Sequence, residues 1–286
     1  MPNSIAGFAG GMALNTLIHP TAVIHAGSQI HPSASIGPYA VIGEKVTVGA
    51  DTTVGAHAVI DGYTKIGDRN RIFPHTAIGL EPQDLKYDGS MSLVDIGNDN
   101  AIRECVTINR PTRLGEVTAI GNHNLIMAYA HVAHNCSIAD RVIIANSVAL
   151  AGHVEIESHA RLSGLVGVHQ FVHIGRYAMV GGMSRIERDV PPYTMVEGNP
   201  SRVRGLNQVL LSRSGIAKEA DGQVYKGLKE AFRVLYRSGL TLEEAISKLE
   251  AMSDNAHVRH LYEFLRASAH NKSRRGPVPG RKKAAH

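Results

Sequence analysis

The chain has 286 residues and a mass of 30.7 kDa, is 43% hydrophobic and contains no tryptophan. This apolar content excludes wholesale disorder, the two cysteines cannot form a disulfide framework, and no run of about 18 apolar residues predicts a membrane span. The N-terminal stretch lacks the basic segment of a secretory signal, so we expect a cytoplasmic protein.

The net charge of +5 comes from the C-terminal end. Residues 271–286 carry six Lys or Arg residues and no acidic residue, and the rest of the chain has 24 basic and 25 acidic residues. We therefore predict a basic, disordered tail at 271–286, and an N-terminal extension at 1–16. A nearly neutral body argues against nucleic acid as a partner.

A six-residue repeat begins at Ile18 and continues to Ile186. Of the 29 positions spaced six apart in this range, 27 are Ile, Val or Leu. A small residue often stands two positions earlier, on the same face of a strand, and glycine often follows, where we expect a tight corner. The pattern predicts a mainly β fold, a parallel β-helix over 17–200 with 18 residues in each triangular coil and roughly ten coils.

The repeat is interrupted twice. Within 79–95 the expected aliphatic positions hold Asp84 and Ser90, and a second excursion occupies 109–119. Loops on a rigid scaffold often carry function, and a tolerated insertion is the alternative for each.

A helical period follows the end of the repeat at Pro191. It predicts an α-helical C-terminal domain over 201–270. Thr241 and Glu244 match the pattern of a capping box. The expected helices are 206–213, 217–238, 241–253 and 256–268.

Residues 18 apart should stack on successive coils, and this spacing brings histidines together. His134, His153 and His169 should line one edge of the prism, about 5 Å apart per coil, with His134 next to Gly152. His131 should also point outward, one corner earlier. Such a cluster fits general base catalysis, a metal site, or a polar ladder that satisfies the coil edges.

Five segments carry recognisable motifs: NLIMAYAHVAHNC (124–136), LAGHVEI (150–156), GVHQFVHIG (167–175), QDLKY (83–87) and DVPPY (189–193). They resemble the UDP-N-acetylglucosamine acyltransferase family, which acts first in lipid A biosynthesis. The resemblance covers about 17–268 and implies a left-handed β-helix and a homotrimer with active sites between subunits. The implied reaction moves an (R)-3-hydroxyacyl group from acyl carrier protein to the 3-hydroxyl of UDP-N-acetylglucosamine, and neither a cofactor nor a metal is expected.

The resemblance also implies roles for individual residues. His134 would be the general base, and the N–H of Gly152 would be the oxyanion donor. Gly182 matches the position that gauges acyl length, where glycine suggests a longer chain. The other matching residues would bind or orient the acyl chain and the nucleotide sugar: Lys86, His131, His153, His169 and Gln170, with Asn207 and Arg213 at the nucleotide.

Four positions depart from the family pattern, and the contacts of the family are not carried over to them. Asn135 follows the implied base in place of Asp, Asn109 replaces a His, and Val209 and Ser214 replace a Glu and an Arg. Cys136 falls at an inward position of the repeat and is expected to be structural.

Three other functions are compatible with a β-helix of this kind. A related N-acyltransferase acts later in the same pathway, but that family carries an additional N-terminal uridine-binding domain. A zinc carbonic anhydrase on this fold would carry a three-histidine site with an H-x4-H pair, and this chain has no H-x4-H pair. A purely structural solenoid would leave the histidine cluster and both loops without a role.

Overall fold

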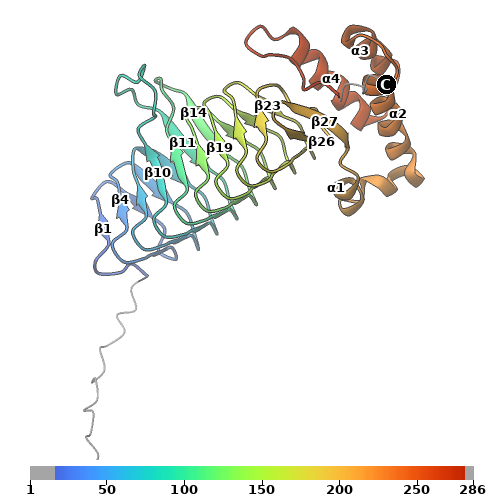
Figure 1. Ribbon diagram of the computed structural model, residues 1–286. Coiled ribbons are helices and arrows are strands. Elements are labelled where there is room, and N and C mark those ends of the chain that lie inside the picture. Colours follow the sequence, from blue (N-terminus) through green and yellow to red (C-terminus); the bar gives the residue numbers. More distant parts are fainter. Residues whose placement is uncertain (1–16, 281–286) are drawn as a thin grey trace, which may run out of the picture.

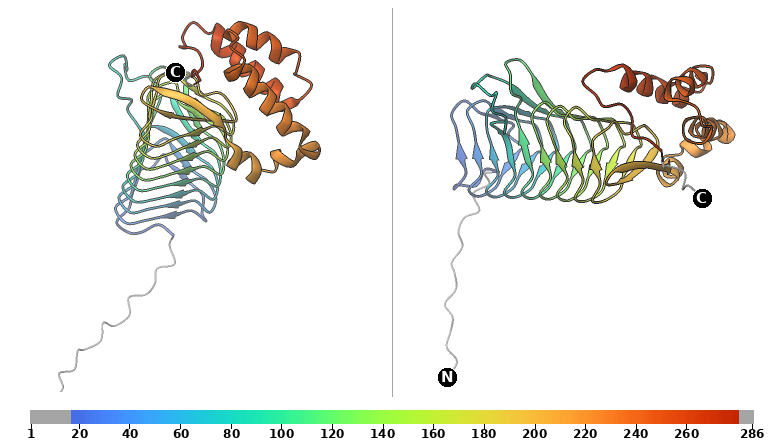
Figure 2. Two further views of the ribbon diagram at one scale, coloured as in Figure 1. Left: turned by 45° about the vertical axis from the view of Figure 1, so that its right-hand side comes forward. Right: turned by 45° about the horizontal axis from the view of Figure 1, so that its top comes forward.

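The computed structural model describes residues 17–280, so the predicted extension at 1–16 and residues 281–286 lie outside the described part. The main body is a prism of short parallel strands, with the helices at its C-terminal end (Figures 1 and 2). Away from the two loops, paired strands up to residue 186 are 18 residues apart, as in the pairing of Val41 with Val59. The predicted parallel β-helix is confirmed.

The strands form three sheets, one on each side of the prism, and from β1 to β25 every third strand along the chain joins the same sheet. The first sheet contains β1 (Val23–Ile24), β4 (Val41–Ile42), β7 (Val59–Ile60), β10 (Ala77–Leu80), β13 (Thr107–Asn109), β16 (His131–Val132), β19 (Ala149–Leu150), β22 (Gly167–Val168) and β25 (Arg185–Ile186). The second contains β2 (Gln29–Ile30), β5 (Val46–Val48), β8 (Tyr63–Ile66), β11 (Leu93–Ile96), β14 (Val117–Ile120), β17 (Ser137–Ile138), β20 (Glu155–Ile156) and β23 (His173–Ile174). The third contains β3 (Ser35–Ile36), β6 (Thr53–Val54), β9 (Arg71–Ile72), β12 (Ala101–Ile102), β15 (Leu125–Ile126), β18 (Ile143–Ile144), β21 (Arg161–Leu162), β24 (Met179–Val180), β26 (Thr194–Gly198) and β27 (Ser201–Leu206).

The aliphatic positions of the repeat form the core. Ile42, Ile60 and Ile78 stack on successive coils and are fully buried, as are the small residues Ala40 and Ala58 two positions before the first two. Burial of each such aliphatic side chain contributes about 1.5–3 kcal/mol. Each side of a coil contributes one aliphatic and one small side chain to a narrow interior, so the core has little room for rings. This explains why only 5% of the residues are aromatic.

The corner glycines allow the coils to stack closely. A Cβ atom on Gly37 would lie 3.0 Å from the backbone N of Ala56, and one on Gly55 would lie 2.7 Å from the backbone N of Pro74. The left-handed conformation that turns the corner lies two residues after each of these glycines, at Tyr39 and His57, where φ is 57°. Glycine is therefore needed for the approach of the next coil, and other residues make the turn.

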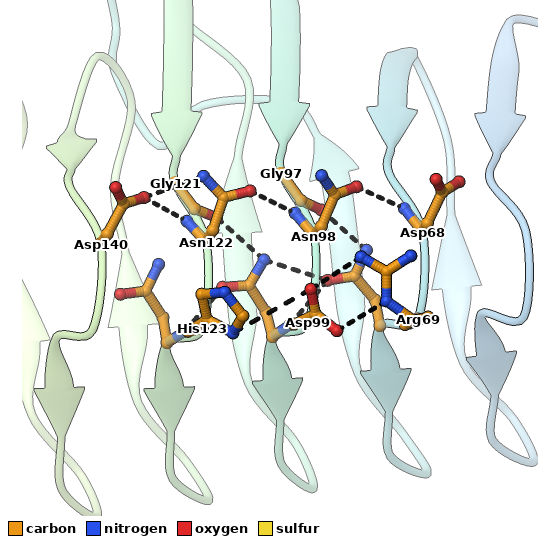
Figure 3. Close-up of polar contacts among 12 residues, drawn as sticks. Asp68, Arg69, Gly97, Asn98, Asp99, Gly121, Asn122, His123 and Asp140 are labelled. Carbon is orange, nitrogen blue, oxygen red and sulfur yellow. Dashed lines mark hydrogen bonds and ion pairs between the residues drawn. The ribbon is translucent and has the colours of Figure 1, made fainter.

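A ladder of polar side chains holds the edge between the second and third sheets (Figure 3). The backbone N–H of Asp68 donates to Oδ1 of Asn98 at 2.7 Å, and that of Asn98 donates to Oδ1 of Asn122 at 2.8 Å. The N–H of Asn122 donates in turn to Oδ1 of Asp140 at 2.6 Å. Each side chain thus satisfies a backbone donor on the preceding coil, as buried or half-buried N–H groups require.

A hairpin lies between the last parallel strands and the helices. Strands β26 and β27 pair antiparallel and extend the third sheet to Leu206, past the predicted boundary at residue 200. The capping box of Thr241 and Glu244 is present. The helices are α1 (Gln208–Arg213), the 3₁₀ helix η1 (Ile216–Gly222), α2 (Gln223–Arg237), α3 (Leu242–Glu250) and α4 (Ala256–His270).

The prediction of a disordered tail at 271–286 is wrong for its described part, 271–280. Val278 is buried, and its N–H donates to the carbonyl of Asp189 at 2.8 Å. Arg274 contacts Glu155 at 2.9 Å and Nδ1 of His173 at 3.0 Å. Acidic groups on the prism therefore hold a segment whose composition alone suggested disorder.

None of the helices within residues 17–280 is long and apolar enough to cross a membrane.

Candidate active site

The histidine edge lies at the corner between the first and second sheets. His134 follows β16, and Gly152 occupies the equivalent place after β19 on the next coil. A Cβ atom on Gly152 would lie 2.4 Å from Cε1 and 2.5 Å from Nε2 of His134. The imidazole therefore lies directly against the Gly152 backbone, a position that only glycine permits.

The two nitrogens of the His134 ring have different surroundings. Nδ1 is 2.8 Å from Oδ1 of Asn135, and Nδ2 of Asn135 donates to Oε2 of Glu116 at 2.7 Å. Nε2 lies 3.9 Å from Oδ2 of Asp84, and both side chains are largely buried. One ring nitrogen is thus hydrogen-bonded to the protein, and the other faces the space beside Gly152.

The two interruptions of the repeat form loops that contact each other over this corner. The first loop, 81–92, supplies Asp84, and the second loop, 110–116, supplies Thr112, whose hydroxyl donates to Asp84 at 3.1 Å. Arg110 donates to the hydroxyl of Tyr87 at 2.8 Å and to the carbonyl of Gly79 at 2.9 Å. The loops therefore bring acidic groups to the histidine edge.

The neighbouring histidines are held in the neutral form. The His153 ring meets His134 edge to face with centroids 5.2 Å apart and stacks on Phe171 at 4.7 Å. Nδ1 of His131 is 2.7 Å from Oγ1 of Thr107. Burial, followed by the charge of His134, lowers the pKa of both His131 and His153. Both rings therefore favour the neutral form beside His134.

An open groove of about 380 Å³ runs over the first sheet beside this corner. Its lining includes His131, Leu150, His169 and Arg185, so His131 and His169 share one surface. Gln170 lines a second cavity of about 250 Å³ together with residues of the C-terminal segment. In that segment Arg275 lies 3.3 Å from Nε2 of His169, and this contact brings the tail next to the histidine cluster.

Lys86 lies on the first loop with an exposed side chain. Its backbone N–H donates to Oδ1 of Asp84 at 3.0 Å. This bond, together with that of the Thr112 hydroxyl, lowers the pKa of the Asp84 carboxyl. Lys86 is thus part of the loop that covers His134.

Three residues implied by the resemblance lie elsewhere in the single chain. Gly182 follows β24 of the third sheet and therefore occupies a different edge from His134. Arg213 is exposed at the end of α1, and Asn207 caps the same helix by accepting from the N–H of Leu210 at 3.2 Å. The other end of the Asn207 amide donates to the carbonyl of Tyr177 at 2.9 Å, so both ends serve the fold.

Two other positions singled out in the sequence are structural. Cys136 is buried as predicted, and burial raises the pKa of its thiol to about 12. Asn109 donates to the carbonyl of Glu81 at 2.8 Å and so fixes the start of the first loop. Within residues 17–280, His, Cys, Asp and Glu side chains form no group of three or more that could hold a metal ion.

Sequence reasoning missed Asp84, Thr112 and Glu116 as parts of the site. Asp84 was visible as a carboxylate at a position where the repeat demands an aliphatic residue, and the other two lie in the second interruption. The signal available in the sequence was that the repeat is interrupted by polar residues on the coils next to the histidines.

Comparisons with known proteins agree with this architecture. Residues 189–278 match a family model described as domain 2 of UDP-N-acetylglucosamine O-acyltransferase, and residues 15–50, 27–62 and 118–152 match the bacterial transferase hexapeptide repeat. The chain is 61% identical to the acyl-[acyl-carrier-protein]–UDP-N-acetylglucosamine O-acyltransferase of Gloeothece citriformis, over 95% of this chain and 97% of that protein. It is 59% identical to the Synechocystis enzyme of the same name over 78% and 79%.

Solved structures give the same result. The UDP-N-acetylglucosamine acyltransferase of Francisella novicida superimposes with a TM-score of 0.86 at 39% identity, over 92% of this chain and 94% of that one. The Arabidopsis enzyme superimposes with a TM-score of 0.79 at 36% identity, over 91% and 99%. Since these similarities span both the β-helix and the helical domain, the chain belongs to the family of UDP-N-acetylglucosamine O-acyltransferases.

Proposed function

We propose that this chain moves an (R)-3-hydroxyacyl group from acyl carrier protein to the 3-hydroxyl of UDP-N-acetylglucosamine, the first step of lipid A biosynthesis, with His134 as the general base. The observation that carries the proposal is an imidazole with Nδ1 bonded to Asn135 at 2.8 Å and Nε2 against the Gly152 corner. The names of the relatives support the two substrates, since they include both acyl carrier protein and UDP-N-acetylglucosamine.

The first step is removal of the hydroxyl proton. Nε2 of His134 takes the proton of the 3-hydroxyl as its oxygen attacks the carbonyl carbon of the thioester. The resulting tetrahedral intermediate carries a negative oxygen, and its collapse breaks the bond to sulfur. The imidazolium then returns the proton to the departing thiolate, so that the free carrier protein, the O-acyl product and neutral His134 remain.

The N–H of Gly152 suits the oxyanion. No hydrogen bond within residues 17–280 uses this N–H as a donor, whereas the adjacent Ala151 and His153 both donate to neighbouring coils. The lack of a side chain at Gly152 lets an intermediate approach both this donor and Nε2 of His134. A preorganised donor at the developing charge is worth about 2.7–4 kcal/mol of barrier.

Binding of the substrates is assigned to the groups around this corner. Lys86, His131, His153, His169 and Gln170 would orient the sugar and the acyl chain, in line with their positions on the first loop and beside the two cavities.

The remaining binding residues support a homotrimer. Asn207 and Arg213 lie in the helical domain and Gly182 lies on another edge of the prism. Threefold assembly with the active sites between subunits would let a neighbouring chain supply Gly182 to the His134 edge. A Cβ atom on Gly182 would have only van der Waals contacts, the nearest at 3.4 Å, so the glycine leaves room for a longer acyl chain.

The test is acyl transfer with His134→Ala. Purified protein with UDP-N-acetylglucosamine and 3-hydroxyacyl carrier proteins of graded length should form the 3-O-acyl product, and the variant should lose about 10²- to 10⁴-fold in kcat. His123→Ala, on the polar ladder edge, is the matched control and should keep its turnover. Near-normal turnover of His134→Ala would refute the assignment of the base, and absence of transfer by the wild type would refute the function.

A further inference from the structure

We propose that Glu116, on the second loop, is a positioning residue that acts through Asn135 and sets the tautomer of the neutral His134 ring. In this role Glu116 keeps the proton of neutral His134 on Nδ1 and leaves Nε2 free to accept the substrate proton. The inference rests on the proposed function, because it concerns how the same base is prepared.

The argument starts from the amide of Asn135, which has one donating end and one accepting end. An ionised carboxylate can only accept hydrogen bonds, so Glu116, 2.7 Å away, must face the Nδ2 end of that amide. The Oδ1 end then faces Nδ1 of His134 at 2.8 Å. Since Oδ1 can only accept, Nδ1 must carry the hydrogen, and Nε2 is the basic nitrogen.

Neighbouring contacts hold this chain of three side chains in place. The N–H of Asn135 donates to Oγ1 of Thr118 at 2.8 Å. Asn135 itself has a φ of 61° and turns the corner of the coil. The N–H of Arg113 donates to the same oxygen of Glu116 at 3.1 Å. The second loop and β14 therefore hold Glu116 and Asn135 in place.

The charges around His134 show why such a device is needed. Asp84 lies 3.9 Å from Nε2 and attracts a proton to that nitrogen, which would place the hydrogen on the wrong side of the ring. His153 and His131 are the other titratable groups beside the ring, and both favour the neutral form. Glu116 lies on the Nδ1 side, so its charge opposes the pull of Asp84.

The first test is Glu116→Gln, which keeps the size of the side chain and removes its charge. Unlike a carboxylate, the Gln amide can either accept or donate a hydrogen bond. The Asn135 amide is then no longer held in one orientation. We expect kcat to fall about 10- to 100-fold, a part of the full contribution of a general base, with KM for UDP-N-acetylglucosamine unchanged. The acid limb of the kcat–pH profile should move to lower pH, because loss of a nearby negative charge lowers the pKa of the base.

A direct readout is the tautomer of His134 in protein labelled with ¹⁵N-histidine. The wild type should show the hydrogen on Nδ1, and Glu116→Gln should show a mixture of both tautomers. Unchanged kcat, pH profile and tautomer would overturn the proposal. A fall in kcat with an unchanged tautomer would also overturn it, because it would indicate a structural role for Glu116.

The control restores a negative charge next to His134, at residue 135 in place of residue 116. In the double variant Glu116→Gln with Asn135→Asp, a carboxylate accepts directly from Nδ1, so kcat and the single tautomer should return. Asn135→Asp alone places two carboxylates at the 2.7 Å contact and should not raise kcat. Failure of the double variant to recover either readout contradicts the proposal.

His134→Ala is assayed alongside to separate the role of Glu116 from that of the base. If His134→Ala is inactive while Glu116→Gln is normal, only the role of Glu116 is refuted. If His134→Ala is active, the proposed base is refuted.

Discussion

Two edges of the same prism use polar residues in opposite ways. On the ladder edge, the side-chain oxygens of Asn98, Asn122 and Asp140 each accept from the backbone of the preceding coil. On the histidine edge, the N–H of Gly152 and Nε2 of His134 have no hydrogen-bond partner within residues 17–280. The repeat geometry is common to both edges, so what distinguishes a structural edge from a chemical one is whether polar groups are satisfied by neighbouring coils.

The loops account for this difference. The ladder edge runs without interruption from coil to coil, whereas the first and second loops contact each other over the histidine edge and supply Asp84 and Glu116. A rigid repeat thus provides the spacing, and the breaks in the repeat provide the chemistry.

The largest effect should come from filling the space on the histidine edge with Gly152→Ala. The added Cβ atom would lie 2.4 Å from Cε1 of His134, so the ring must leave its position. We expect kcat to fall by about 10²-fold or more, because a displaced His134 ring cannot take the substrate proton, with a nearly unchanged melting temperature. Gly205→Ala is the control, since a Cβ atom there meets nothing within 4 Å. Normal acyl transfer by Gly152→Ala would contradict the description of this edge.

The opposite result is expected on the ladder edge with Asn100→Ala. Asn100 is buried, donates to Oδ1 of Asn70 at 3.0 Å and to the carbonyl of Gly121 at 2.9 Å, and accepts from the N–H of Asn124 at 2.9 Å. Loss of these partners should lower the free energy of unfolding by about 1–3 kcal/mol. Urea unfolding measures the loss, and turnover of the folded variant should remain that of the wild type. A stable variant with reduced turnover would show that the two edges are not separate.

A smaller, pH-dependent effect is expected one coil beyond Asp140, at Glu157. Burial alone would raise the pKa of this carboxyl, but His173 at 3.0 Å and His260 at 2.9 Å outweigh burial and lower it. Because the native pKa is below the unfolded value of 4.5, the stabilisation is complete above about pH 4.5 and is lost as the pH falls through the native pKa. The melting temperature of the wild type should therefore exceed that of Glu157→Gln near neutrality, and the gap should close in acid. A gap that is constant or widens below pH 4.5 would contradict this account.

Much of the fold was predictable because each of its rules is local. The spacing of aliphatic residues from Ile18 to Ile186 predicted strand direction, stacking and the inward position of Cys136. The hairpin of β26 and β27 was not predicted, since its pairing depends on contacts with the end of the prism. The ordered segment 271–280 was missed for the same reason: its basic residues find acidic partners only in the folded chain.

The site divides in the same way. The eighteen-residue spacing placed His134 beside Gly152, and the motifs identified the family. The sequence did not connect Glu116 to His134, because the contact passes through the side chain of Asn135 and depends on how the second loop folds.

The sequence by itself determined the repeat, the prism and the place of His134 beside Gly152, since a coil of constant length turns separation along the chain directly into distance in space. Only the tertiary structure decided which polar groups meet where that constant length fails. In the two loops, packing determines that Asp84 lies beside Nε2 of His134 and that Glu116 lies behind Asn135 on the side of Nδ1.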